Sequence, residues 1–325
     1  MKEPWRFLAA LVIGFLAVFA ATMVSFFFAL GVPTESSRWA FEINQKKHSL
    51  ALGTSSPKLL LVGGSATLFG ISAREIQRQT GYRTINLGTH AALGTNYILR
   101  EAKRVAKPGD IVLLDFEYEL YNRGKVERAW ADRLFIDYVV SRDPAFFRSL
   151  STLEQWNIFM LASNERILQG LTNRWQPQER ADWGVYDVRY IDEWGDQRHH
   201  AKEDRSSRPD PVAQVKSILS QGLPERPSGF ASIQSFCQWA HANQIRVVAT
   251  YPNLIDQPEY HLPTAWQSAK RIRDFFSGIN VEVIGDYTDS LLPADQFFDT
   301  RYHLTEEAGL ARTCRLVTQL GRYLE

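Results

Sequence analysis

The hydrophobic residues of the chain gather first in one long run near the N-terminus. No charged residue occurs from Phe7 to Gly31, and this stretch is long enough for a helix that crosses a bilayer. Lys2 and Arg6 precede it, which predicts a cytoplasmic N-terminus and an extracytoplasmic, periplasmic location for the bulk of the chain. Residues 1–31 are therefore predicted to be a cytoplasmic tip and a single transmembrane anchor.

Two other interpretations of this run are less favoured. A cleavable signal peptide is one alternative, because Val18 and Ala20 are small enough for a signal protease. The apolar run continues well past them, whereas the apolar core of a signal peptide is shorter. A buried helix of a soluble core is the other alternative, and the lack of any polar face disfavours it.

Beyond a polar stretch at residues 32–57, interpreted as a stalk, short apolar runs alternate with helical patterns. Continuous runs such as Leu59–Val62 are typical of strands buried on both faces of a sheet. The connections are too long for hairpins, so the strands are predicted to be parallel. Strands are expected at residues 59–62, 83–87, 111–114, 245–251 and 281–284. Residues 58–325 are thus predicted to form an α/β domain with a five-stranded parallel sheet in flavodoxin-like order.

Local signals mark the helices between these strands. Ser72 and Glu75 have the spacing of a capping box, and Gly81 is placed to end that helix. Ser228 is a plausible N-cap for a helix that continues to Asn243. Further helices are expected at residues 96–106, 263–276 and 305–323.

The alternation lapses between residues 118 and 227, which we interpret as a long insertion after the third strand. Helices are predicted at about 129–150 and 153–171, followed by a polar, irregular segment rich in Trp and Tyr. Insertions of this length are usually lids, binding surfaces or mobile segments. The aromatic side chains suit either stacking on sugar rings or packing of a lid.

Composition narrows the class of function. The formal charge is +1 and no cluster of Lys and Arg occurs, which disfavours nucleic-acid binding. Glycine-rich nucleotide motifs are absent, so no nucleotide cofactor is expected, nor any other cofactor. Cys237 and Cys314 lack a metal-type spacing and fit one optional disulfide or, as we favour, two buried thiols in helices.

A metal site is disfavoured as well. His199 and His200 are adjacent, but Asp196 is the only carboxylate near them at ligand spacing and no cysteine accompanies them. The prediction is therefore that the chain holds no metal.

The candidate chemistry lies just after the strands, because ligands of parallel sheets bind outside the carboxyl ends of the strands. Ser65 follows the first strand and two glycines, which permit a tight turn. The backbone amide of Ala66 could then face a developing oxyanion. The alternative is a Gly-Gly-Ser turn without chemistry.

Asp299 and His303 lie four residues apart, just before the last predicted helix. A serine hydroxyl needs a base within hydrogen-bond reach, and that base needs an orienting group. His303 and Asp299 could supply both. Alternatively, the two side chains only satisfy backbone groups of their loop.

Together these segments resemble the SGNH (GDSL-like) hydrolase and acyltransferase superfamily. The Gly-Asp-Ser block of that family corresponds to Gly63-Gly64-Ser65, and its last Asp and His correspond to Asp299 and His303. More narrowly, the chain is similar to the membrane-anchored branch typified by the D-alanyl transfer protein of teichoic acid operons and by exopolysaccharide O-acylation proteins. Members share an N-terminal anchor, a Leu-Phe-Gly sequence after the serine, and a Tyr-His-Leu sequence at the histidine. The resemblance covers about residues 58–117 and 245–325.

The sequence departs from the family pattern at the third block. Gly-x-Asn-Asp is absent and Asp115–Glu119 stands in its place, so the Asn that would complete the oxyanion hole is missing. Loss of one such donor costs on the order of a hundredfold in rate. Gly88, or else Gly94, corresponds to the glycine of the second block. Glu117 could orient a loop or bind a hydroxyl, or could cap nearby amides.

The resemblance implies an acyl-enzyme on Ser65, with His303 as base and Asp299 as its orienting group. The acyl group would pass to a hydroxyl of a polysaccharide or glycolipid, or to water, and a multi-spanning acyltransferase could be the partner that supplies it. The alternatives are a non-catalytic assembly or binding protein of a polysaccharide acylation or export system, and a plain secreted esterase. The predicted oxyanion and binding residues are Gly64, Ala66, Gly88, His90, Glu117 and Asn253.

Overall fold

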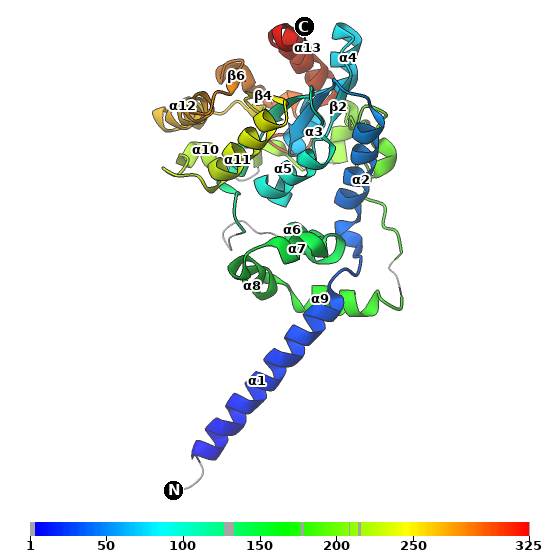
Figure 1. Cartoon of the computed structure of the whole chain (residues 1–325), viewed down its shortest axis with the longest axis vertical. Coiled ribbons are helices and arrows are strands. Elements are labelled where there is room, and N and C mark those ends of the chain that lie inside the picture. The colour runs from blue at the N-terminus through cyan, green and yellow to red at the C-terminus, as the bar shows by residue number, and fades with distance from the viewer. Residues whose placement is uncertain (1–3, 127–132, 177–178, 208, 214–215, 325) are drawn as a thin grey trace. The chain divides into compact units, whose positions relative to one another are not determined.

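The computed structural model describes residues 4–126, 133–176, 179–207, 209–213 and 216–324 (Figure 1). The start of the predicted cytoplasmic tip, residues 1–3, lies outside these ranges. The chain divides into two compact units. The first unit contains Met1–Phe41 and Val126–Ala181, and the second contains Glu42–Lys125 and Asp182–Glu325.

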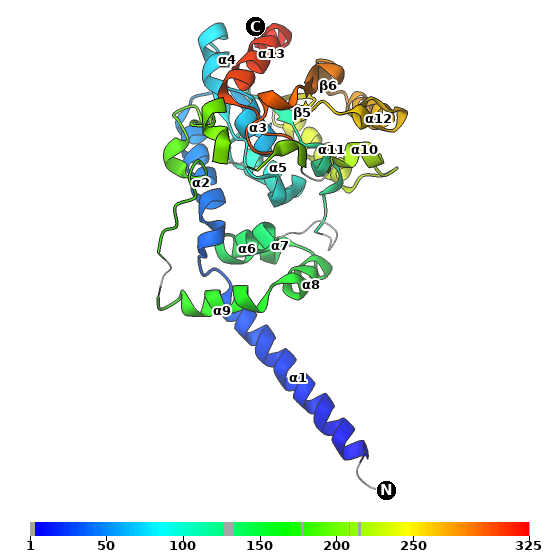
Figure 2. The ribbon, with the colours of Figure 1, turned by 180° about the vertical axis from the view of Figure 1, so that it is seen from behind.

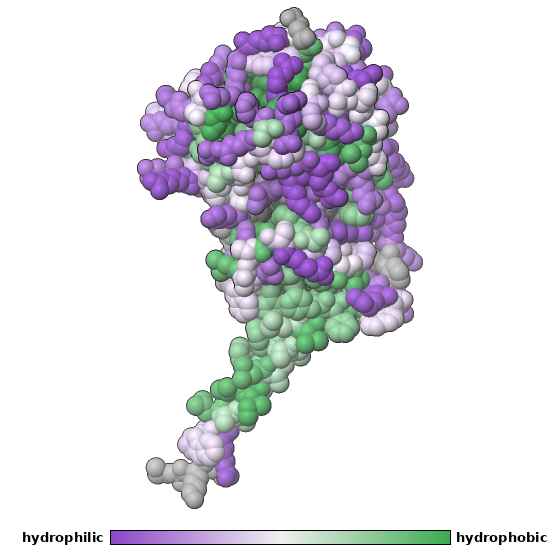
Figure 3. Space-filling view, in the orientation of Figure 1, coloured by the Kyte–Doolittle hydropathy of each residue, from purple (hydrophilic) through white to green (hydrophobic). Residues whose placement is uncertain are grey.

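Helix α1 of the first unit, Pro4–Ala29, coincides with the predicted anchor. Its 26 residues correspond to about 39 Å, which exceeds the roughly 30 Å of a bilayer's hydrocarbon core. The most apolar window of the helix has no buried residues, unlike the core helix of a soluble protein. Figure 3 shows that α1 presents a hydrophobic surface along most of its length. By length and composition the helix can therefore cross a membrane.

The rest of the first unit is helical. The predicted helix at 129–150 is two helices, α6 (Arg133–Arg142) and α7 (Pro144–Ser149), and its residues 129–132 lie outside the described ranges. The break occurs because Pro144 cannot donate a helical hydrogen bond, while Asp143 accepts from Phe146 N and starts a new helix. The stretch predicted at 153–171 is likewise divided, by the N-cap Ser163. Its two parts are α8 (Thr152–Leu161) and α9 (Asn164–Thr172).

Two arginines bind the C-terminal carbonyls of α1. Arg174 Nη2 donates to Phe28 O at 2.7 Å, and the buried Arg166 donates to Ala29 O at 3.4 Å. These carbonyls have no partner within the helix, and positive charge at a helix C-terminus is favourable. The arginines therefore join the end of α1 to the helices of the first unit.

The predicted stalk is mostly helical. It holds the short 3₁₀ helix η1 (Glu35–Ser37) and α2 (Arg38–Gly53). Helix α2 begins in the first unit and ends in the second, where Lys47 is buried and donates to Gly88 O.

The second unit is built on the predicted five-stranded parallel sheet, with strand order β2-β1-β3-β4-β6. This is the flavodoxin-like order that the alternation of elements predicted. All residues of β1 and β3 are buried, as their continuous apolar sequences indicated. The strands are β1 (Leu59–Gly63), β2 (Thr84–Asn86), β3 (Ile111–Asp115), β4 (Arg246–Thr250) and β6 (Glu282–Ile284).

Helices cover both faces of this sheet (Figures 1 and 2). Helices α4 and α13 pack together on one face, over a core that includes Leu61, Leu113 and Leu316. Helices α5 and α11 pack together against β1 and β4. The helices of this unit are α3 (Ser65–Gly70), α4 (Ala73–Thr80), α5 (Gly94–Val105), α10 (Ile218–Gln221), α11 (Ser228–Ala242), α12 (Pro263–Gly278) and α13 (Glu306–Leu324).

Most helix boundaries agree with the local signals, with one exception. Ser72 Oγ accepts from Glu75 N at 3.1 Å, and Gly81 ends α4 with a φ of 71°. The prediction of Ser228 as N-cap is wrong. Helix α11 begins at Ser228 itself. The Ser228 hydroxyl instead accepts a hydrogen bond from Gly124 N at 3.1 Å.

The structure adds elements that the patterns did not predict. A second, two-stranded parallel sheet joins β5 (Leu254–Ile255) to β7 (Leu291–Leu292), and strands of two residues carry no periodicity to detect. Helix α3 follows β1 after one residue, in place of the predicted turn. Further 3₁₀ segments are η2 (Ala91–Leu93), η3 (Tyr118–Asn122), η4 (Val188–Tyr190), η5 (Lys202–Ser207), η6 (Pro211–Ala213), η7 (Pro258–His261), η8 (Thr288–Ser290) and η9 (Ala294–Gln296).

The cysteines are both free, and only one matches the prediction. Cys237 is buried in α11, and burial raises the pKa of its thiol to about 12, which makes it inert at neutral pH. Cys314 is exposed on the solvent side of α13, so the prediction of a buried thiol is wrong there.

Candidate active site

Ser65 lies at the carboxyl end of β1, as the first residue of α3. The two glycines before it are required by close packing rather than by a left-handed backbone. A Cβ atom on Gly63 would lie 2.1 Å from Asp115 O, and one on Gly64 would lie 2.4 Å from Glu117 Oε2. The glycines thus let the end of β3 approach the serine.

The carboxylate of Glu117 binds the backbone around Ser65. Ala66 N donates to Glu117 Oε1 at 2.7 Å, and Gly64 N donates to Oε2 at 3.2 Å. Ser65 Oγ also donates to Oε1, at 3.2 Å. Glu117 therefore caps nearby amides and binds a hydroxyl at the same time, which are two of the three roles considered for it.

Glu117 is almost fully buried, with 1% of its surface exposed. Burial raises the pKa of its carboxyl from 4.5 to about 7, despite the opposing effect of the hydrogen bond from the Ala66 amide. The carboxyl is consequently part protonated at neutral pH, and its charge next to Ser65 responds to small changes of pH.

A Glu117→Gln variant should remove a pH dependence of stability. The unfolded chain ionises Glu117 near pH 4.5, but the folded chain ionises it only near pH 7, so the contribution of Glu117 to the stability of wild type is lost as the pH rises through this window. The loss is on the order of 3 kcal/mol in the free energy of unfolding. Denaturant unfolding of the full chain in detergent, at about pH 4.5 and pH 8, measures it.

The matched control is Glu307→Gln, which changes an exposed carboxylate on α13. It should keep the pH dependence of wild type, whereas the free energy of unfolding of Glu117→Gln, taken relative to that of wild type, should change between the two pH values. Identical pH dependence in all three proteins would show that Glu117 is not buried as an acid.

Asp299 and His303 form the predicted pair. Asp299 Oδ1 lies 2.7 Å from His303 Nδ1, and both side chains are nearly buried, at 4% and 6% exposure. Thr300 makes the turn between them, because its hydroxyl accepts from His303 N at 3.1 Å. A spacing of four residues is therefore compatible with a hydrogen-bonded Asp–His pair whose Nε2 remains for a reacting group.

Tyr186 is a site residue that the sequence reasoning did not identify. Its hydroxyl donates to Asp299 Oδ2 and lies 3.5 Å from His303 Nδ1. It comes from the Trp- and Tyr-rich part of the insertion, so the aromatic composition was the available signal. Residues 182–200 of the insertion thus lie against the Asp–His pair.

Phe69 links the Ser65 helix, α3, to the loop that carries Asp299 and His303. Its ring stacks on the His303 imidazole with centroids 4.2 Å apart, and it follows Ser65 by one helical turn. Ser65 and His303 are therefore at the same edge of the sheet. Among the described residues, however, Ser65 Oγ bonds Glu117, and no hydrogen bond joins it to His303.

Two further histidines lie near His303. His90 Nδ1 accepts from Ala92 N at 3.0 Å, and burial, helped by His303, lowers the pKa of His90 to about 4. His200 packs edge-on against Phe69, and burial lowers its pKa to about 3. Both are neutral at physiological pH, so they shape the site without adding charge. His90 was among the binding residues predicted from the sequence, whereas His200 was considered only as a metal ligand and its place beside Phe69 follows from packing.

A metal cluster is not formed around the histidines of the insertion. The described residues contain no group of three or more potential metal ligands. Asp196, the one carboxylate considered with His199 and His200, accepts instead from Ala73 N at 2.8 Å and Arg74 N at 3.0 Å. It caps the start of α4.

The amide of Gly88 has a partner within the chain. It donates to Asn86 Oδ1 at 2.8 Å, so a role as oxyanion donor would require this bond to break and stays a prediction. The glycine is needed because a Cβ atom there would lie 2.5 Å from Leu68 N in α3. The amides of Gly64 and Ala66 remain as donors, both now bound to Glu117.

Asn253, predicted as a binding residue, is fully buried and binds residues that support the site instead of lining it. Its Oδ1 accepts from Arg312 at 2.8 Å, and its Nδ2 donates to Tyr302 O. Arg312 also binds both carboxylate oxygens of Asp115, at 2.8 and 3.2 Å. The ends of β3 and β4, the His303 loop and α13 are thus joined by one buried network.

Glu119 holds the other side of the same loop. It accepts from Tyr302 OH at 2.8 Å and from Arg301 at 3.1 Å. Although burial alone would raise the pKa of Glu119, the Arg301 charge and the Tyr302 hydroxyl lower it. An ionised Glu119 therefore positions the loop that carries Asp299 and His303.

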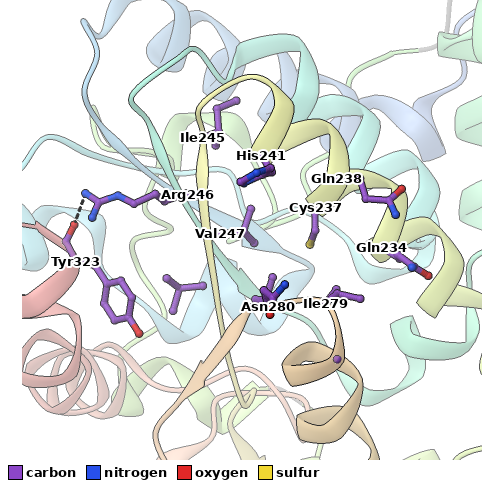
Figure 4. Close-up of a pocket in the computed structure, with 13 residues that line it drawn as sticks. Gln234, Cys237, Gln238, His241, Ile245, Arg246, Val247, Ile279, Asn280 and Tyr323 are labelled. Carbon is purple, nitrogen blue, oxygen red and sulfur yellow. Dashed lines mark hydrogen bonds between the residues drawn. The ribbon is translucent and has the colours of Figure 1, made fainter.

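A cavity of about 510 Å³ lies elsewhere in the second unit. Figure 4 shows Cys237, His241 and Asn280 around it, and Arg246 donating to Tyr323 O. Its lining residues include those that precede β4 and β6, so it lies at the amino ends of the strands, opposite to Ser65. It contributes nothing to the candidate active site.

No protein-family model matches the chain, and no curated protein matches it significantly. Functional assignment therefore depends on the geometry described above.

Proposed function

We propose that the chain is a membrane-anchored SGNH-like enzyme that forms an acyl-enzyme on Ser65. The observation that carries the proposal is the position of Glu117 Oε1, which lies 2.7 Å from Ala66 N and 3.2 Å from Ser65 Oγ. A carboxyl oxygen beside the serine is held there by the Ala66 amide, and the Gly64 amide binds the other oxygen of the same group, as donors to the oxyanion of acyl transfer would. The acyl oxygen would take the place of this carboxylate oxygen.

The reaction would proceed by general-base catalysis. Ser65 Oγ attacks the acyl carbonyl carbon while His303 Nε2 takes the hydroxyl proton, and the proton then passes to the leaving group as the donor's acyl bond breaks. An acceptor hydroxyl or water reverses these steps and releases Ser65. Asp299 keeps Nδ1 protonated throughout. Glu117 has to move aside first, and its protonation near neutral pH weakens its hold on the amides.

The substrate classes follow from the site and the anchor. Ser65 is only 9% exposed and the Tyr186 segment lies against the Asp–His pair, so the site suits a short acyl group and requires that segment to move. A periplasmic catalytic domain tethered to the membrane by α1 suits polysaccharide or glycolipid acceptors. A multi-spanning acyltransferase is the proposed source of the acyl group.

A second candidate function is a non-catalytic assembly or binding protein of a polysaccharide acylation or export system. The bond from Ser65 to Glu117, in place of one to His303, favours it. In that case the fold would be shared with enzymes but the chemistry would not.

A fluorophosphonate probe that reacts with activated serines tests the proposal on the full chain in detergent micelles. Wild type should be labelled and Ser65→Ala should not. Ser277→Ala, which changes an exposed serine on α12, is the control and should label as wild type does. With an aryl ester as acyl donor, faster turnover on adding an oligosaccharide indicates a transferase, and unchanged turnover indicates an esterase.

A Glu117→Ala variant distinguishes the two candidate functions if wild type is not labelled by the probe. If Glu117 only blocks the amides, this variant should be labelled even where wild type is not. Absence of labelling in both proteins, with the fold intact by circular dichroism, would establish the non-catalytic alternative.

A further inference from the structure

Helix α8 of the first unit exposes large apolar side chains along one face. Leu153, Trp156 and Met160 are 68%, 42% and 47% exposed, and their spacing places them on the same side of the helix. Such a stripe on a water-soluble protein normally faces the core. Here it stays exposed, apart from the contact of Trp156 with Phe19 of α1.

The polar side chains of α8 are turned toward the rest of the unit. Glu154 Oε1 accepts from Val126 N at 3.1 Å, and Gln155 Nε2 donates to Leu150 O at 2.8 Å. Both flank Ile158, which is fully buried. The polar side chains of Glu154 and Gln155 are therefore satisfied by the protein, while the side of Leu153, Trp156 and Met160 is left for another environment.

The apolar side is continuous with the anchor. The rings of Trp156 and Phe159 pack on Phe19 of α1 with centroids 6.0 and 5.8 Å apart, and Phe159 also packs on Phe26. Figure 3 shows the hydrophobic surface of α1 continuing onto the helices around its C-terminal end. Leu168 of α9 and Trp175, at 61% and 74% exposure, belong to the same unit.

The depth of this contact can be estimated along α1. Arg174 binds the carbonyl of Phe28, and its charge belongs at the level of the lipid headgroups. Phe19 precedes Ala29 by ten residues, which is about 15 Å of helix. If α1 spans a bilayer, Phe19 and the rings that touch it lie among acyl chains.

We infer that α8 is a membrane-inserted surface helix, whose face of Leu153, Trp156 and Met160 is covered by the lipid leaflet next to Arg174. Apolar and aromatic side chains on one face of a helix at the lipid boundary are typical of this mode of binding. The helix would set the depth of the anchor and hold the first unit against the membrane. The inference rests on the proposed membrane anchor, and it does not depend on acyl chemistry.

Site-directed fluorescence tests the inference in phosphatidylcholine vesicles that contain the full chain. Single cysteines for a bimane probe are introduced into a Cys237→Ala, Cys314→Ser background. Met160→Cys reports on α8, Leu11→Cys on α1 as the lipid reference, and Gln267→Cys on exposed α12 as the water reference. Each is quenched in turn by lipids brominated in mid-chain and by aqueous iodide.

The probe at residue 160 should lose most of its emission with brominated lipid and little with iodide, like the probe at residue 11. Quenching by iodide to the extent seen at residue 267 would overturn the inference. Shielding from both quenchers would also overturn it, in favour of a second copy of the chain covering α8. A probe at residue 11 that is itself quenched by iodide would instead contradict the membrane anchor.

Discussion

An Asp299→Asn variant is expected to react with the fluorophosphonate probe about 10³–10⁴-fold more slowly than wild type. Asp299 Oδ1 lies 2.7 Å from His303 Nδ1, and this carboxylate holds the proton on Nδ1 so that Nε2 can act as the base. An asparagine amide can donate to Nδ1 and favour the wrong tautomer. The loss should appear in the rate of labelling at saturating probe, with the fold unchanged.

Tyr186→Phe is the matched control for this prediction. It removes the second hydrogen bond to Asp299, on Oδ2, but leaves the bond between Asp299 and His303. Its effect should be no more than about 10- to 100-fold, since a bond to a charged group contributes about 1.5–3 kcal/mol. An Asp299→Asn variant that reacts at the wild-type rate would exclude His303 as the base and direct attention to Glu117.

The second large effect concerns stability. Arg312→Met should lower the free energy of unfolding by about 3–5 kcal/mol, because it leaves the carboxylate of Asp115 buried without its charged partner. Asp115 is fully buried, and Arg312 binds both of its oxygens as well as Asn253 Oδ1 and Tyr251 O. Denaturant unfolding of the full chain in detergent, followed by circular dichroism, gives the difference.

Arg322→Met serves as the control because it lies on the same helix, α13, and breaks an exposed ion pair with Glu282. Exposed pairs contribute about 0–1 kcal/mol, so this variant should unfold close to wild type. The double variant Arg312→Met, Asp115→Leu should recover much of the loss, because no uncompensated charge remains. Equal stability of the two single variants would show that the network does not support the site.

The buried network explains why the candidate residues meet. Asp115 ends β3, Asn253 follows β4 and Arg312 lies in α13. Their hydrogen bonds therefore hold the carboxyl ends of these two strands and α13 together. Glu119 adds the bond to Tyr302, next to His303. A mutation in this network is therefore expected to affect both the stability and the geometry of the Asp–His pair.

The sequence by itself determined the elements and the edge at which chemistry could occur. The uncharged run of α1, the apolar strands and the boundaries at Ser72 and Gly81 are local signals, because burial and capping impose them within a few residues. The parallel order followed from the lengths of the connections. The Asp299–His303 pair was also local, since its members are one turn apart.

Only the tertiary structure decided which partner each polar side chain takes. Glu117 could bind a loop, a hydroxyl or amides from sequence alone, and its position 52 residues from Ser65 means that folding brings them together. Tyr186 bonds Asp299 although the two are 113 residues apart in the sequence. The backbone amide of Gly88 donates to Asn86, and the close approach of α3 leaves no space for a side chain at Gly88.

The same limit applies to α8, whose helical pattern was detected but whose outward direction was not. Periodicity shows that a helix has an apolar face, while the rest of the fold decides whether that face meets protein, water or lipid.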